Sequence, residues 1–320
     1  MNLSSRSARA YAPASIGNVA AGFDILGAAL APLDGSPLGD VVEARFAPED
    51  AFTLEGPYAE RLGRESKTNL VQRTRDLFRE ALAAKGAALA PLALRLEKHL
   101  PLSSGLGSSA SSIVATLAAL QALCGEPFSR TECLELAARA EGTYSGGAIL
   151  DNVAPCLLGG LQMVVPGDEG PTVRGLPWPD DLVFVVCHPN FELPTAKSRA
   201  VLPEAIPLDR AVAFADNLAG LIHALHSRDR RLLARCLRDP LAEPFRADLV
   251  PGFSAAQTAA RKSGAIGCSL SGSGPATFAV ATDDRAPAIA EALASAFREA
   301  GLNSQTWICG LDQEGARVLA

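Results

Sequence analysis

The sequence predicts an α+β protein with two domains, and three observations support this prediction. A loop rich in glycine and serine, residues 101–110, lies between a strand-like run and a helical run. Prolines and glycines cluster at residues 166–179, which is typical of a domain boundary. Beyond this cluster the predicted elements follow the order β-α-β-β-α-β, which is that of a split βαβ unit. We therefore expect one domain over residues 1–166 and a second over residues 167–320.

Hydrophobic periodicity and turn residues predict the individual elements. In the first domain they predict strands at residues 8–14, 40–46 and 92–98, and helices at residues 69–85, after the loop (through Ile113, Leu117 and Leu120) and at 133–141, behind a capping box at 129–132. In the second domain they predict strands at residues 182–187, 265–270, 276–282 and 304–309, and helices at residues 208–239, 253–263 and 284–300. The second set gives the split βαβ order, with extra helix between its first two strands.

The composition limits the classes of protein to consider. The chain has 320 residues, of which 48% are hydrophobic and 5% aromatic, so its core must consist mainly of Ala, Leu and Val. A net charge of −6 argues against a nucleic-acid partner. No apolar run approaches the ~20 residues of a membrane helix, and the first residues lack the apolar core of a signal peptide, so we expect a cytoplasmic protein without a membrane partner. The seven cysteines lack Cys-x-x-Cys spacing and are expected to be buried thiols.

The loop between the predicted strand and helix has the features of an anion site. It consists of Pro101, Leu102, Ser103, Ser104, Gly105, Leu106, Gly107, Ser108, Ser109 and Ala110. Glycine allows a ligand to approach the backbone closely, and the first turn of a helix offers free N–H groups and the positive end of the helix dipole. Phosphate is the expected ligand; the alternative is a flexible loop with a serine N-cap. The loop is neither a Walker A motif nor a Gly-x-Gly-x-x-Gly motif, which disfavours a Rossmann dinucleotide site.

Isolated acidic and amide side chains are candidates for substrate or metal binding. Asp24 lies in an apolar segment, where a carboxylate usually needs a partner, so it either caps a turn or binds a cation such as a substrate ammonium. Glu141, Asp151 and Asn152 lie near the end of one predicted helix and the start of the next segment. They either cap these elements or bind Mg²⁺ and substrate, because a nucleotide site needs a carboxylate for its metal.

Two arginines and a second glycine loop are further candidates. Arg199 follows a strand and its loop, and Arg246 lies at a helix break. Each is either a surface charge or a planar, bidentate donor to a substrate carboxylate. Residues 271–275, Ser-Gly-Ser-Gly-Pro, form either a plain hairpin turn or a loop that presses backbone N–H groups against the ligand of the first loop.

Three motifs together resemble those of the GHMP small-molecule kinase superfamily, in the expected order. They are residues 13–27, PASIGNVAAGFDILG, residues 102–110, LSSGLGSSA, and residues 271–275, SGSGP. Within this superfamily, residues 151–160, 195–199 and 242–246 resemble those of the homoserine kinases. The resemblance covers nearly the whole chain. It implies the GHMP kinase fold, with an N-terminal, ribosomal-protein-S5-like domain that binds nucleotide, a C-terminal ferredoxin-like domain, and a substrate site between them.

The resemblance also implies roles for individual residues. The loop at 101–110 would wrap the phosphates of ATP, Asn69 would lie near the nucleotide, and Ser109 and Glu141 would serve Mg²⁺. The residues that would hold an amino-acid substrate are Asn18, Asp24, Asp151, Arg199 and Arg246, with the carboxylates toward its ammonium group and the arginines toward its carboxylate. Asn152, beside the attacking hydroxyl, and Asp24 are the candidates for a catalytic role.

For the activity, the resemblance implies that ATP phosphorylates L-homoserine to O-phospho-L-homoserine, a step of threonine biosynthesis. Because an amide cannot accept a proton, it implies direct in-line transfer that depends on positioning and charge stabilisation, without a protein general base. A kinase for another small alcohol and a ligand sensor of the same fold without turnover are the alternatives. The resemblance further implies a homodimer. Family members often carry a histidine at the position of Ile149, so one polar contact to the substrate is absent.

Overall fold

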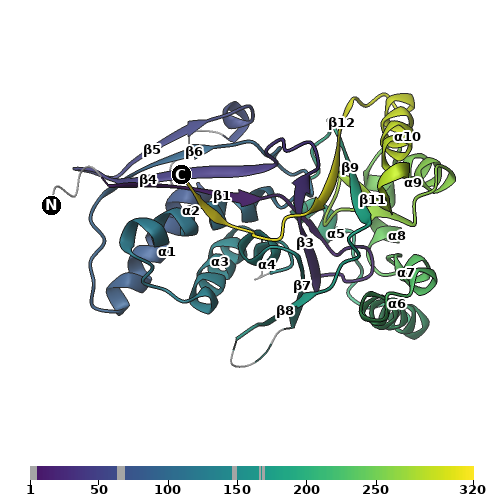
Figure 1. The fold of residues 1–320 in the computed structure, drawn as a ribbon, viewed down its shortest axis with the longest axis horizontal. Coiled ribbons are helices and arrows are strands. Elements are labelled where there is room, and N and C mark those ends of the chain that lie inside the picture. The colour runs from purple at the N-terminus through teal and green to yellow at the C-terminus, as the bar shows by residue number, and fades with distance from the viewer. Residues whose placement is uncertain (1–5, 63–68, 146–149, 166, 168–169) are drawn as a thin grey trace.

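The computed structural model contains two β-sheets, each with its own helices, that lie side by side along the long axis of the molecule (Figure 1). It describes residues 6–62, 69–145, 150–165, 167 and 170–320. The predicted α+β class and the two-part organisation are confirmed.

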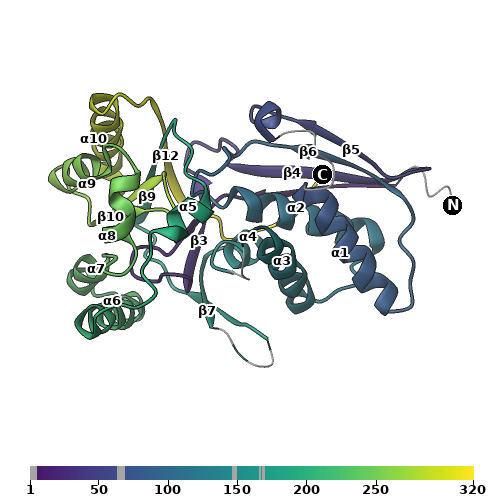
Figure 2. The same ribbon diagram turned by 180° about the vertical axis from the view of Figure 1, so that it is seen from behind.

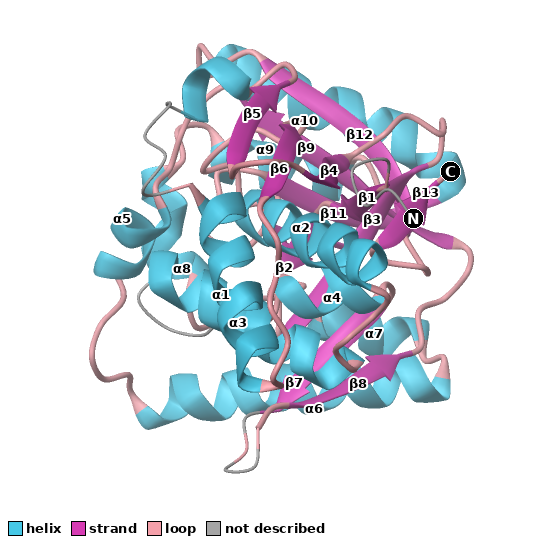
Figure 3. Cartoon of the chain, turned by 90° about the vertical axis from the view of Figure 1, so that its left-hand side faces the viewer, coloured by secondary structure: helices cyan, strands magenta, loops and turns pink. Residues whose placement is uncertain are grey.

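The first sheet has five strands in the order β13-β1-β4-β6-β5. Its strands are β1 (Ser7–Pro13), β4 (Gly39–Phe46), β5 (Ala51–Glu55), β6 (Leu92–Glu97) and β13 (Arg317–Leu319). β5 pairs with β6 in parallel, and the other neighbours are antiparallel. On one side of this sheet lie α1 (Leu70–Ala84), α2 (Ser108–Cys124), α3 (Arg130–Ser145) and α4 (Val153–Leu158), as Figure 3 shows. A short 3₁₀ helix, η2 (Ala59–Leu62), follows β5.

Helix α2 is the centre of the first part. It packs against β1 and β4 on one side and against α1, α3 and α4 on the others. Ile113, Leu117 and Leu120, whose spacing predicts the helix, are all fully buried. A helix that is apolar on all sides is expected where its neighbours cover every face. This packing fixes the direction of α2 and therefore the place of its amino end.

The second sheet has the strand order β10-β11-β9-β12-β3-β7-β8, with β2 paired to β3, and all its pairs are antiparallel. Its strands are β2 (Ser15–Gly17), β3 (Leu26–Pro32), β7 (Leu161–Val165), β8 (Thr172–Leu176), β9 (Leu182–Pro189), β10 (Gly267–Leu270), β11 (Thr277–Thr282) and β12 (Ser304–Leu311). The accompanying helices are α5 (Thr195–Ala200), α6 (Leu208–Ser227), α7 (Arg230–Cys236), α8 (Glu243–Arg246), η3 (Ala247–Leu249), α9 (Phe253–Lys262), η4 (Asp283–Arg285) and α10 (Ala286–Glu299).

Strands β9 to β12 form the predicted split βαβ unit, with the antiparallel order β10-β11-β9-β12. β9 is buried on both faces. Val183, Val185 and Cys187 belong to the hydrophobic cluster that includes α9 and α10. The alternate residues of β9 belong to the cluster that includes α6 and α7. Because both faces are covered, the strand is a continuous apolar run in the sequence.

The chain crosses between the two sheets. β3, β7 and β8 join the second sheet, and β13 returns to the first sheet beside β1. β3 and β7 precede residue 166 and β13 follows it, so neither sheet is built from only one side of that residue. The cluster of prolines and glycines at residues 166–179 contains β8. The division into domains at that residue stays a prediction. The crossings place residues 15–32 and helix α5 at the junction of the two parts (Figure 2).

Two local predictions depend on caps. The capping box is confirmed, because the Ser129 amide donates to Glu132 Oε2 at 2.7 Å and the Glu132 amide donates to Ser129 Oγ at 3.3 Å. The helical segments predicted over roughly 208–239 form two helices, α6 and α7: Arg228 has a φ of 56°, and Asp229 caps α7 by accepting from the Leu232 amide at 3.0 Å. Among the described residues, no helix has both the length and the apolar character needed to cross a membrane.

Candidate active site

A cavity of about 530 Å³ opens at the junction of the two parts. All the predicted site residues line it except Pro101, Leu106 and Ala110. These three are buried: Leu106 and Ala110 belong to the two hydrophobic clusters on either side of the loop. They support the loop from behind, and the serines and glycines between them face the cavity.

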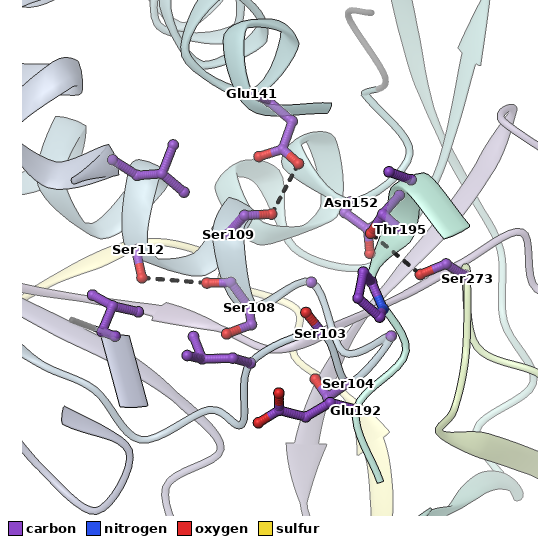
Figure 4. A pocket seen from close by; sticks show the side chains of 18 of the residues that line it. Ser103, Ser104, Ser108, Ser109, Ser112, Glu141, Asn152, Glu192, Thr195 and Ser273 are labelled. Atoms are coloured by element: carbon purple, nitrogen blue, oxygen red, sulfur yellow. Dashed lines mark hydrogen bonds between the residues drawn. The ribbon is translucent and has the colours of Figure 1, made fainter. Parts of the chain in front are cut away.

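The amino end of α2 opens into this cavity. Its N-cap is Gly107, with a φ of 63°, and no side chain of the described residues caps the helix there. Ser108 and Ser109 form the first turn and line the cavity, as Figure 4 shows. Since the N–H groups of a first turn have no partner within the helix, the site can accept an anion.

The second glycine loop, residues 271–275, forms a hairpin turn and also contacts the first loop. It joins β10 to β11. The Ser271 hydroxyl donates to the Gly105 carbonyl at 2.5 Å, and the Ala276 amide donates to the Ser104 carbonyl at 2.9 Å. Gly272 and Ser273 line the cavity. Ser273 also lies 3.4 Å from the hydroxyl of Thr195 at the start of α5 (Figure 4).

A buried ion pair lies beneath the first loop. Lys98 and Asp40 are almost fully buried and form a salt bridge. The Lys98 ammonium also donates to the Ser108 carbonyl at 2.8 Å, and Asp40 accepts from the backbone amides of His99 and Leu100 at 3.0 and 3.1 Å. Burial lowers the pKa of Lys98, and the nearby charge of Asp40 partly offsets this decrease. The pair therefore ties β4, the start of the loop and the first turn of α2 together.

Sequence reasoning missed Lys98, although the sequence contains a signal for it. Leu92, Leu94 and Leu96 are the buried positions of β6, and Lys98 continues the same alternation. Side chains two residues apart point to the same face of a strand. A lysine on the buried face, directly before a glycine loop, is a candidate for a structural ion pair.

The two metal candidates, Ser109 and Glu141, lie next to each other. Ser109 Oγ donates to Glu141 Oε1 at 2.8 Å, between the first turn of α2 and helix α3 (Figure 4). Glu141 is buried, and both residues line the cavity. A hydroxyl and one carboxylate fit Mg²⁺, which usually takes one or two carboxylates and completes its shell with waters and substrate phosphates. The residues present therefore fit Mg²⁺.

Asp151 and Asn152 line the same cavity, directly before α4. Asn152 Nδ2 donates to Asp151 Oδ1 at 3.0 Å, and Asn152 Oδ1 accepts from the Ser15 hydroxyl at 2.9 Å. Both side chains are close to Gly17, where an added Cβ would lie 2.6 Å from Asp151 Oδ2. Burial, and then the nearby charge of Asp24, raise the pKa of Asp151 to about 7.

In the structure the charge of Asp24 is paired with that of Arg199. Arg199 Nη2 donates to Asp24 Oδ1 at 2.8 Å. Arg246 is buried rather than a surface charge: its Nε donates to the Ser198 carbonyl at 3.2 Å and its Nη1 to the Gly272 carbonyl at 3.0 Å. Two carboxylates and two guanidinium groups thus line the same cavity.

Two other predicted positions connect the cavity to its surroundings. Asn18 Nδ2 donates to the Gly272 carbonyl at 3.3 Å, and its Oδ1 accepts from the Asp24 amide at 3.3 Å. Asn69 caps α1 by accepting from the Val71 amide at 2.9 Å, and it lines the cavity. Ile149, where relatives often have histidine, lies outside the described residues.

Comparisons with known proteins agree with this geometry. The family model described as GHMP kinases N terminal domain matches residues 69–160, and the model described as GHMP kinases C terminal matches residues 221–299. The crystal structure of homoserine kinase from Cytophaga hutchinsonii is 35% identical, with a TM-score of 0.89, and the match covers 98% of this chain and 97% of that one. The chain therefore belongs to the GHMP kinase family and is a small-molecule kinase.

More distant structures share the fold. A putative homoserine kinase from Listeria monocytogenes is 24% identical, with a TM-score of 0.71, over 98% of this chain and 99% of that one. The L. major mevalonate kinase in complex with R-mevalonate is 18% identical, with a TM-score of 0.70, over 95% of each chain. These two likenesses show the shared fold.

Proposed function

We propose that this kinase transfers the terminal phosphate of ATP to the side-chain hydroxyl of L-homoserine, giving ADP and O-phospho-L-homoserine. The observation that carries the proposal is the charge pattern of one cavity. The cavity is lined by the open amino end of α2 and the Ser109–Glu141 pair. It is also lined by two carboxylates and two guanidinium groups, those of Asp24, Asp151, Arg199 and Arg246. Such a pattern suits a zwitterion with one carboxylate and one ammonium group.

The proposed positions of the reactants follow from these groups. The loop at 101–110 and the first turn of α2 would hold the phosphates of ATP, and Ser109 and Glu141 would hold Mg²⁺. When bound, Mg²⁺ supplies positive charge that offsets the charge of the phosphates. The carboxylates would face the ammonium group of the substrate, and the arginines would face its carboxylate. This arrangement would direct the side-chain hydroxyl toward the terminal phosphate.

The proposed transfer needs no protein base. A bond forms between the hydroxyl oxygen and the terminal phosphorus, while the bond from that phosphorus to the β-phosphate oxygen breaks. The hydroxyl proton passes to the transferred phosphate. Asn152 is held by Ser15 and Asp151 and would orient the hydroxyl, because an amide donates and accepts hydrogen bonds without taking the proton. Positioning is therefore the main contribution of the protein.

Replacing Arg246 by methionine tests the proposed substrate. The loss of a charge-assisted hydrogen bond costs about 1.5–3 kcal/mol, so the KM for L-homoserine should rise about 10- to 100-fold while the KM for ATP changes little. For 3-amino-1-propanol, which is homoserine without its carboxylate, the same substitution should raise the KM far less than for L-homoserine. The matched control is Arg210→Met, because Arg210 stacks on Phe245 and does not line the cavity. Unchanged homoserine kinetics in both Arg199→Met and Arg246→Met would contradict the proposal.

The pKa of Asp151 predicts a pH dependence. Only the ionised carboxylate attracts an ammonium group, so kcat/KM for L-homoserine should rise about tenfold per pH unit and level off above pH 7. In Asp151→Asn, kcat/KM for L-homoserine should be low and independent of pH between pH 5.5 and 8. A wild-type profile that stays flat between pH 5.5 and 8 would contradict the assignment of Asp151 to the ammonium group.

The same carboxyl group affects stability in the opposite direction. Its pKa in the folded protein, about 7, lies above its usual value of 3.8. Between these values the folded protein binds a proton that the unfolded chain releases. The contribution of Asp151 to the free energy of unfolding is therefore fully present below pH 3.8, falls as the pH rises, and is lost once the pH has passed about 7. Urea unfolding of Asp151→Asn should lack this loss.

A further inference from the structure

The two arginines proposed to face the substrate carboxylate share one aromatic ring. The Cζ atom of Arg199 lies 5.7 Å from the ring centroid of Phe23, and the Cζ atom of Arg246 lies 5.1 Å from it. The arginines come from different helices, α5 and α8, and Phe23 comes from the segment between β2 and β3. A guanidinium group within about 6 Å of a ring centroid is attracted by the ring's quadrupole.

Such a pair of cations needs something to hold it. Two like charges close to one another repel, and burial and then the charge of Arg199 lower the pKa of Arg246. Asp24 offsets the charge of Arg199. The backbone carbonyls of Ser198 and Gly272 accept from Arg246. Each of these contacts holds one arginine, whereas the ring of Phe23 contacts both.

Phe23 itself lies in a tightly constrained segment. Asn18, Val19, Ala20 and Asp24 all have positive φ angles, of 71°, 42°, 61° and 58°. For residues other than glycine this conformation is costly and persists only where the surroundings impose it, most often at functional sites. The two hydrogen bonds of Asn18, to Asp24 and to the Gly272 loop, close the segment. The segment thus presents a fixed ring to two side chains from elsewhere in the chain.

We propose that Phe23 is a positioning residue: its ring holds the guanidinium groups of Arg199 and Arg246 together as a pre-formed pair for one carboxylate. That this carboxylate belongs to L-homoserine rests on the proposed function. Arg199 Nε is buried and has no hydrogen-bond partner within the described part of the chain. A buried donor without a partner is unfavourable, so it is a fitting donor for the incoming carboxylate.

Calorimetric titration with L-homoserine tests the effect on the ligand. Phe23→Leu keeps an apolar side chain of similar size but removes the ring, and it should weaken binding about 5- to 30-fold, the effect of losing two such contacts. Phe23→Tyr keeps a ring and should bind within about twofold of the wild type. The control, Phe245→Leu, removes the ring beneath Arg210, outside the cavity, and should bind normally. Equal binding by Phe23→Leu and the wild type would overturn the proposal.

Labelling with phenylglyoxal tests the same role without any substrate. The rates of modification of Arg199 and Arg210 are followed by peptide mass spectrometry. In Phe23→Leu, Arg199 should react several-fold faster and Arg210 at its normal rate; in Phe245→Leu the pattern should be reversed. Faster labelling of both arginines in Phe23→Leu would indicate general loosening and would overturn the proposal. If the wild type does not bind L-homoserine, the proposed substrate is wrong, and the labelling still decides the role of Phe23.

Discussion

Replacing Lys98 by methionine is expected to lower the free energy of unfolding by about 3–5 kcal/mol, because removal of one partner leaves the other as an uncompensated buried charge. Asp40 is completely buried and would lose the ammonium group that balances it. The same variant should raise the KM for ATP, since the Lys98 ammonium donates to the Ser108 carbonyl in the first turn of α2. Urea unfolding and steady-state kinetics measure the two effects.

Lys85→Met is the matched control for this prediction. Lys85 pairs with Glu132 at 2.6 Å, but its side chain is 43% exposed. Exposed pairs contribute about 0–1 kcal/mol, so this variant should unfold almost like the wild type. The double variant Asp40→Leu with Lys98→Met removes both charges and should recover part of the loss. If Lys98→Met were as stable as Lys85→Met, the ion pair would not hold the loop.

Replacing Gly105 by alanine is expected to lower kcat/KM by about 100-fold or more, because small displacements of catalytic groups have effects of this size. Gly105 has a φ of 79°, and a Cβ at this position would lie 2.3 Å from the Ser271 carbonyl oxygen. The two glycine loops would have to separate, and the first loop would move away from its place at the amino end of α2.

Gly125→Ala separates this clash from the conformational cost. Gly125 caps the other end of α2 with nearly the same φ, 78°, and a Cβ there would meet nothing within 4 Å. It should therefore cost about 1–2 kcal/mol of stability, as expected for an L residue in the left-handed region, and leave kcat/KM near the wild-type value. Equal activities of Gly105→Ala and Gly125→Ala would show that the contact between the loops is not required.

Local patterns predicted much of this fold. The Leu spacing of α2, the alternation of β6 and the capping box of α3 each depend on residues within a few positions of one another, and all three are confirmed. The order of elements also sufficed for the split βαβ unit, since its strand order follows from its connections.

Long-range pairing was not predictable in the same way. β3 pairs with β7 and β12, which follow more than a hundred residues later, and β13 returns to β1 from the end of the chain. The sequence indicated that Asp24 needs a partner, but its pairing with Arg199, 175 residues away, depends on the crossing of the chain between the sheets. The residues around Arg246 left open whether it is a surface charge for the same reason, because the carbonyls that accept from it belong to other segments.

The most direct test of the proposed substrate is an ADP-release assay of the wild-type protein with ATP and Mg²⁺, with L-homoserine, L-threonine, L-serine and mevalonate as acceptors. The charge pattern of the cavity predicts turnover with an amino-acid acceptor rather than mevalonate, and the proposed function predicts that L-homoserine is the preferred amino acid, with little ADP release without an acceptor. Turnover only with mevalonate, which lacks an ammonium group, would contradict the assignment of Asp24 and Asp151. Absence of turnover with all four acceptors would contradict the proposed activity.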